Sequence, residues 1–127
     1  MKKLLLYAGF MSIIIFTSLN AYAETTTIIC DYKKYAAEDG IHAVKDKFTL
    51  TFVVDKEKGV AYILGNQGSA KVTMLSSGTG LTFIEITTAG NVMTTTIDSQ
   101  GNTVHSRNTV ITGKLVPTQY YGKYETK

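Results

Sequence analysis

The stretch KFTLTFVV at residues 47–54 decides the fold class of this chain. Large apolar residues occupy every second position in it, and a period of two places their side chains on one face of a β-strand. The polar residues 55–58 and Gly59 follow as a turn, in which Gly59 supplies the left-handed conformation. The stretch therefore predicts one arm of a β-hairpin, with Phe52 on the face that packs in the core.

Turn signals rich in glycine recur about every ten residues from Gly59 onward, which is the spacing of short antiparallel strands. The intervening runs are rich in Thr, Val, Ile, Phe and Tyr, whose side chains fit a pleated surface. Runs of this kind occupy residues 26–32, 47–54, 60–64, 70–75, 81–87, 92–97, 103–111 and 115–121. The sequence predicts an all-β protein of about eight short antiparallel strands in a meander, forming a small barrel or a compact sandwich.

Residues 33–46 differ from the rest of the chain because they lack a period of two. We expect a loop with one helical turn in this segment. Such an insertion in a regular meander is either a plain connection or the edge of a binding site.

Residues 1–23 have the pattern of a secretory signal peptide. Lys2 and Lys3 precede a mostly apolar stretch that ends in the small-x-small sequence Ala21-Tyr22-Ala23. The apolar stretch is broken by polar residues and is shorter than a membrane-spanning helix requires. We expect cleavage after Ala23, no membrane span after cleavage, and a periplasmic or secreted protein whose residues 24–127 form a single β domain.

The charge and motif content of this domain argue against several classes of partner. The chain has 13 Lys and Arg and 10 Asp and Glu, and loss of Lys2 and Lys3 leaves 11 basic against 10 acidic residues, a net charge of +1. A nearly neutral protein is a poor partner for nucleic acid. The histidines, the cysteine and the carboxylates show no metal-ligand spacing, so the sequence predicts neither a metal nor a cofactor.

Cys30 is the single cysteine of the chain and lies in the apolar run Ile28-Ile29-Cys30. We expect its thiol to be buried in a strand, and the other interpretation is a dimer joined through Cys30. A nucleophilic cysteine needs a neighbouring group that lowers its pKa, and no His or Arg is close to Cys30 in the sequence.

The densest group of polar side chains lies between Asp98 and Arg107. A Ser-His-Asp hydrolase is disfavoured here, because His105 and Ser106 are neighbours that point to opposite faces of a strand. The Asp98 side chain is expected to bond its own backbone in a turn. His105 and Arg107 share a face, and a guanidinium suits a carboxylate or a phosphate. This pair is a candidate contact to a ligand or partner, unless Arg107 forms an ion pair with Glu85 across the sheet.

Three further residues complete the set of binding candidates. Glu85 faces solvent or, if it points inward, a polar pocket shared with Arg107 or a lysine. Tyr120 and Tyr121 offer rigid amphipathic rings that bind a sugar or a protein groove, or that close a barrel. The candidates for binding are His105, Arg107, Glu85, Tyr120 and Tyr121, and the sequence offers no catalytic residue.

The last third of the chain, together with the leader and Cys30, resembles a group of small exported bacterial proteins of uncharacterised function. The matching segments are MTTTID at 93–98, Gly101, VHSRNTVI at 104–111 and PTQYYG at 117–122. In that group a second cysteine follows the Tyr-Tyr-Gly segment and would bridge to the residue that matches Cys30, whereas Tyr124 stands at that place here. The resemblance implies a compact exported β domain and no particular activity.

These patterns predict a non-catalytic, exported binding or inhibitor-type module. It would engage another exported protein or a component of the cell envelope through its loops and the face of His105 and Arg107. Two alternatives stay open, a small hydrolase-like enzyme that uses His105, Arg107 and Glu85, and a purely structural envelope protein. The enzyme requires these three side chains at one concave site, and their scattering over opposite faces would remove it.

Overall fold

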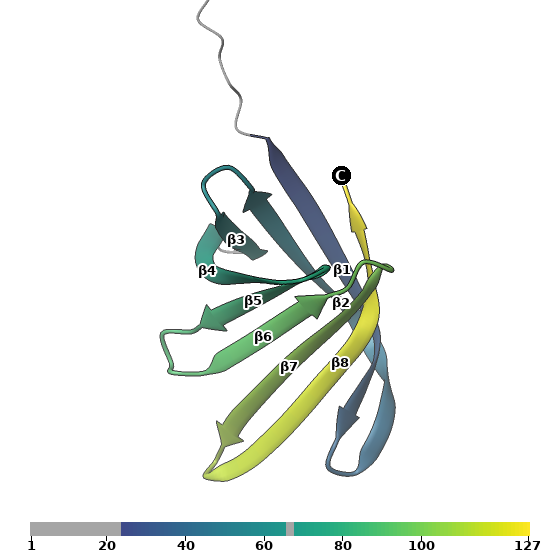
Figure 1. The fold of residues 1–127 in the computed structure, drawn as a ribbon. Helices are drawn as coiled ribbons and strands as arrows, with labels where there is room; N and C mark the ends of the chain where they lie inside the picture. Colours follow the sequence, from purple (N-terminus) through teal and green to yellow (C-terminus); the bar gives the residue numbers. More distant parts are fainter. Residues whose placement is uncertain (1–23, 66–67) are drawn as a thin grey trace, which may run out of the picture.

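Eight antiparallel strands form a closed barrel in the computed structural model, which describes residues 24–65 and 68–127 (Figure 1). The strands are β1 (Thr25–Ala37), β2 (Gly40–Asp55), β3 (Val60–Gly65), β4 (Gly68–Ser77), β5 (Gly80–Ile86), β6 (Val92–Ile97), β7 (Asn102–Ile111) and β8 (Lys114–Thr126). Each strand pairs with the next along the chain, and β8 pairs with β1 to close the ring. The predicted all-β meander is confirmed, and it is a barrel rather than a sandwich.

Two long hairpins extend the barrel at one end. The β1–β2 ladder continues as far as the pair of Ala37 with Gly40, and the β7–β8 ladder as far as Ile111 with Lys114. Figure 1 shows both hairpins reaching beyond the shorter strands β3–β6. The expectation of a loop with a helical turn at 33–46 is therefore wrong. A register shift between residues 32 and 34 breaks the alternation that would have marked this segment as a strand.

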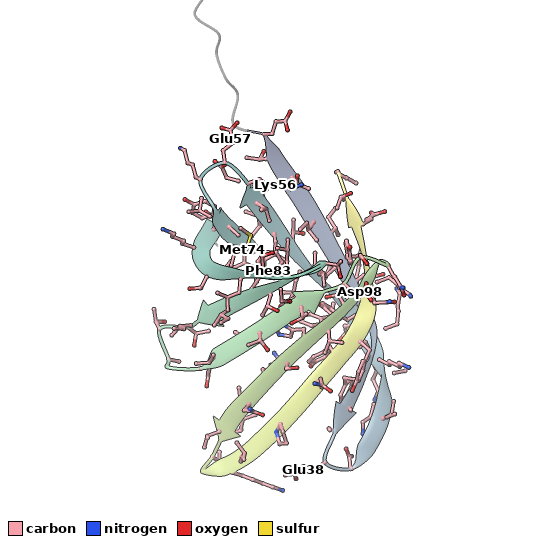
Figure 2. All side chains as sticks on the ribbon, viewed as in Figure 1. Glu38, Lys56, Glu57, Met74, Phe83 and Asp98 are labelled. Atoms are coloured by element: carbon pink, nitrogen blue, oxygen red, sulfur yellow. The ribbon has the colours of Figure 1, made fainter. Side chains whose placement is uncertain are left out.

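The two ends of the barrel differ in polarity. The end to which the long hairpins project, called the hairpin end below, carries the turns at 38–39, 87–91 and 112–113, together with Gly65 at the end of β3 and Gly68 at the start of β4. Of the nine exposed large apolar side chains of the described residues, Tyr62 and Leu75 lie away from this end. The other seven lie near it, namely Ile41, Leu64, Ile86, Val92, Val110, Ile111 and Leu115. The opposite end carries polar turns, and Figure 2 shows Glu57 of one of them far from Glu38 at the hairpin end.

The core fills the barrel on the side away from the hairpin end. Its buried apolar residues are Ile28, Cys30, Tyr32, Phe52, Val54, Ala61, Val72, Phe83 and Ile97. Phe52 and Phe83 stack with their ring centroids 4.3 Å apart, and Phe83 lies inside the barrel in Figure 2. The expectation that Phe52 belongs to the core is confirmed.

Side chains and glycine fix the turns as the sequence indicates. Gly59 has a φ of 63°, the left-handed conformation expected for the end of the β2–β3 turn. In the β6–β7 turn, Oδ1 of Asp98 accepts hydrogen bonds from the backbone nitrogens of Gln100 at 2.9 Å and Asn102 at 2.8 Å. The predicted role of Asp98 in its own turn is confirmed, and hydrogen bonds from Asn102 lower the pKa of its carboxyl group.

The predicted signal peptide and its cleavage site lie outside the described residues, so export stays a prediction. Among residues 24–65 and 68–127, no helix is long and apolar enough to cross a membrane.

Candidate functional site

Three neighbouring strands bring Glu85, Met93 and Arg107 into one row. Met93 on β6 pairs with Glu85 on β5 and with Arg107 on β7. Because neighbouring strands lie about 4.8 Å apart, the backbones of Glu85 and Arg107 are separated by about 10 Å. Thr95 and His105 form the next inward-facing pair, farther from the hairpin end. The row of Glu85, Met93 and Arg107 therefore lies nearer the hairpin end, and Thr95 and His105 lie deeper in the barrel.

This row forms part of the wall of a pocket of about 560 Å³. Gly65 and Gly68, which flank the β3–β4 connection, also line the pocket and place its mouth at the hairpin end. Its apolar lining residues are Phe48, Leu50, Ile63, Leu64, Ala70 and Met93. Pockets of this volume accommodate small molecules, and an eight-stranded barrel has room for one small ligand.

Arg107 faces the pocket without a carboxylate partner. Its Nη2 donates a hydrogen bond of 2.6 Å to the hydroxyl of Tyr120, and its Cζ lies 5.0 Å from the centroid of that ring. All acidic residues of the chain lie in the described part, and neither Arg107 nor Glu85 forms an ion pair there. The ion pair between Arg107 and Glu85 that the sequence left open is therefore absent. Arg107 keeps free donors for a ligand.

His105 forms the floor of the pocket as a neutral, hydrogen-bonded side chain. It is only 2% exposed, and its Nδ1 shares a hydrogen bond of 2.8 Å with the hydroxyl of Thr95. Burial and, to a smaller extent, the positive charge of Arg107 together lower the pKa of His105 to about 4. His105 is therefore neutral at neutral pH, and Arg107 and Glu85 are the basic and acidic side chains that line the pocket beside it.

Cys30 lies in the barrel interior, away from this pocket. Its exposed fraction is 0%, which confirms the expectation of a buried thiol. Burial raises the pKa of the Cys30 thiol, so little of the reactive thiolate forms at neutral pH. A dimer through Cys30 stays a prediction, and it would require the thiol to leave the interior.

The structure separates the two tyrosine candidates. Tyr120 points inward and packs against Phe48, with ring centroids 4.7 Å apart. Tyr121 lies on the outer face, where its hydroxyl donates a hydrogen bond of 2.6 Å to Oε1 of Gln119. Ser106 also lies outside and accepts a hydrogen bond from Gln119, so it faces away from His105 as predicted. His105, Arg107 and Glu85 thus share one pocket, Tyr120 contacts Arg107, and Tyr121 is not part of this group.

A second hollow lies beside this pocket. It is lined by residues of the two long hairpins, including Tyr35, His42, Phe48 and Tyr120. The rings of Tyr35 and His42 stack with centroids 5.0 Å apart. Tyr35 and His42 were not among the sequence candidates, because the register shift obscures the strand pattern of this segment of β1 and β2. Met93 was also not a candidate, although its even spacing from the buried Ile97 indicates an inward position.

The described residues bring no group of three or more His, Cys, Asp and Glu side chains together as a metal site. Fold and pocket define the class as an eight-stranded meander barrel with an open internal pocket. Comparison with protein-family models, with curated proteins and with solved structures finds no match for this chain.

Proposed function

We propose that the protein is an exported, non-catalytic binding module whose site is the pocket at the hairpin end. The proposal rests on one observation, the presence of two unpaired charged side chains, Arg107 and Glu85, in a largely apolar, solvent-accessible pocket. The group bound there belongs to a component of the cell envelope or to another exported protein. Mostly apolar pockets with a few oriented polar groups are the usual form of small-molecule sites.

The open pocket favours a binding role over a purely structural one. The interior of an eight-stranded barrel is either filled by side chains or holds one small ligand. Here Phe48 and Leu50 remain only partly buried, although they continue the inward-facing row of the buried Phe52. A ligand that covers apolar side chains in an unfilled space removes their surface from water, and this burial favours binding.

The hydrolase-like alternative keeps some support, because His105, Arg107 and Glu85 do share one concave site. The arrangement lacks the contact on which nucleophilic catalysis depends. His105 uses Nδ1 to bond Thr95, and no hydrogen bond among the described residues joins it to Ser69, the hydroxyl that also lines the pocket. Binding is therefore the better-supported function.

Filling the pocket tests this proposal. Ala70 lines the pocket, and Ala70→Trp would occupy much of the space between β4 and Arg107. Ala89 lies in the exposed β5–β6 turn, so Ala89→Trp adds the same side chain outside the site. We expect the neutral fluorescent dye Nile red to bind the wild-type protein and Ala89→Trp saturably, with affinity reduced at least about tenfold in Ala70→Trp. Equal binding by all three proteins would show that the dye binds outside the pocket, and would contradict the proposed binding site.

Two further measurements address the alternatives. Hydrolysis of p-nitrophenyl acetate that is lost in His105→Gln but kept in His42→Gln would favour the enzyme over the binding module.

Export predicts that the protein from the periplasmic fraction begins at Glu24, and intact-mass analysis that finds residues 1–23 still attached would contradict it.

A further inference from the structure

The charged groups of the pocket are gathered on one side of it. Glu85 comes from β5 and Arg107 from β7, whereas Phe48, Leu50 and Ile63 line the facing side from β2 and β3. A ligand that satisfies both sides has an apolar body and a polar head. This division points to an amphiphile rather than to a uniformly polar molecule such as a sugar.

The geometry around Arg107 indicates the charge of the head. Its hydrogen bond to the Tyr120 hydroxyl and its position over the Tyr120 ring hold the guanidinium in one place. A half-buried guanidinium without a carboxylate partner is stabilised by an incoming anion, and its planar fork matches a carboxylate. The Tyr120 hydroxyl accepts the bond from Arg107 and retains its own proton for donation to the same anion.

Glu85 limits the charge that the head carries. It lines the same pocket with its backbone about 10 Å from that of Arg107, across Met93. A second negative charge on the ligand would lie between the two strands and be repelled by the Glu85 carboxylate. A monoanion held at Arg107 avoids this repulsion.

We propose that the pocket binds a single-chain amphiphile through a carboxylate head held by Arg107 and the Tyr120 hydroxyl. The alkyl chain packs along Phe48, Leu50, Ile63 and Met93. This inference rests on the proposed binding function and specifies the ligand class. The head lies near the mouth, because Arg107 is one inward-facing position closer to the hairpin end than the buried His105.

Competition against bound Nile red tests the head group with the alkyl chain held constant. Dodecanoate, dodecanol and dodecyl phosphate are titrated below the concentrations at which they form micelles. We expect dodecanoate to bind about tenfold or more tightly than dodecanol, because a hydrogen bond to a charged group is stronger than one between neutral groups. Dodecyl phosphate, which carries more negative charge at neutral pH, is expected to bind more weakly than dodecanoate.

Variants of the charged residues assign this preference to Arg107. In Arg107→Gln the preference for dodecanoate over dodecanol should vanish, and Arg107→Lys should keep part of it, because the charge remains while the fork is lost. Glu85→Gln should strengthen dodecanoate binding by about two- to threefold, since a like charge is removed. Lys71→Gln removes an exposed cation from outside the pocket and should preserve the wild-type preference. Circular dichroism spectra establish that each variant is folded.

The outcomes separate this inference from the proposed function. Equal affinities for dodecanoate and dodecanol, with Nile red binding intact, would overturn the anionic head alone. Tighter binding of dodecyl phosphate would overturn the carboxylate assignment. If neither Nile red nor any dodecyl compound binds, the pocket function and the ligand class both fail.

Discussion

Cys30 and Tyr124 lie directly opposite each other across the seam at which β8 closes the barrel onto β1. Near the seam's end, Thr27 and Lys127 exchange two backbone hydrogen bonds, of 3.2 and 2.9 Å. Because hydrogen-bonded and non-hydrogen-bonded pairs alternate in an antiparallel ladder, Cys30 and Tyr124 form a non-hydrogen-bonded pair, in which the Cα atoms approach most closely. This is the kind of pair that two cysteines can bridge.

Tyr124→Cys should therefore form a disulfide with Cys30 under oxidising conditions. The bond would join two strands far apart in the sequence, and a long closed loop is expected to stabilise the oxidised form over the reduced form of the same variant by about 4 kcal/mol. Urea unfolding with and without reductant measures this difference. The double variant Cys30→Ala, Tyr124→Cys should show no dependence on reductant. Free thiols that persist in oxidised Tyr124→Cys would contradict the register of the seam.

His105 should make the protein less stable in mild acid. Burial and the nearby charge of Arg107 lower the pKa of His105 to about 4, whereas in the unfolded chain its pKa is about 6.5. Protons therefore bind His105 in the unfolded chain at a higher pH than in the folded protein. The contribution of His105 to the free energy of unfolding is fully present above pH 6.5 and falls by about 3 kcal/mol in total as the pH falls toward 4. The carboxylates of Asp39 and Asp98, whose pKa values are lowered by hydrogen bonds, lose their contributions at still lower pH.

Unfolding of His105→Gln across this pH range checks the assignment. The variant should lose most of the slope between pH 6.5 and 4, whatever its absolute stability. His42→Gln, which alters a partly exposed histidine outside the core, should keep the slope. An unchanged slope in His105→Gln would mean that another group binds the protons.

Gly122→Ala should be one of the most damaging single-methyl changes in the chain. A Cβ at this position would overlap the carbonyl oxygen of Asp31 and lie 2.9 Å from Cα of Tyr32, so two backbones would have to separate. We expect a loss of about 3 kcal/mol or more, or failure to fold. Gly65→Ala is the matched control, because its Cβ meets only ordinary contacts at 3.9 Å. Similar midpoints in urea for both variants would show that β1 and β8 do not approach this closely.

Phe52→Ala should remove a central part of the core. The ring is 1% exposed and stacks on Phe83, so its loss leaves a cavity and is expected to cost about 3 to 5 kcal/mol. Ile86 is 72% exposed, and Ile86→Ala should change the free energy of unfolding by less than about 0.5 kcal/mol. Chemical denaturation of the two variants measures the contrast, and a small effect at Phe52 would place it outside the core.

The sequence sufficed for the strands whose apolar residues alternate without interruption. The period of two at residues 47–54 and the glycine turns led to the meander, because both signals are local. The prediction of a loop at 33–46 is wrong, because strand pairing across a register shift depends on the partner strand and not on the local pattern.

The candidate site could be predicted from the sequence only in part, again because only local patterns can be recognised there. Alternation along β7 places His105 and Arg107 on one face, but it does not say whether that face is the inside of a barrel. The pairing of Glu85 and Arg107 with the same residue, Met93, depends on the order of three strands. The choice of Tyr120, rather than Glu85, as the partner of Arg107 depends on side-chain geometry across β7 and β8.

The seam between β1 and β8 also shapes how the chain folds. These strands lie at opposite ends of the described chain, so their pairing closes the longest loop and has the largest loop-closure entropy cost of the strand pairs. An open sheet exposes two unpaired edges until β8 has been added. The same seam brings Thr27 and Lys127 together, and joining the two ends by a short linker would allow a circular permutant to begin at another turn and keep the same barrel.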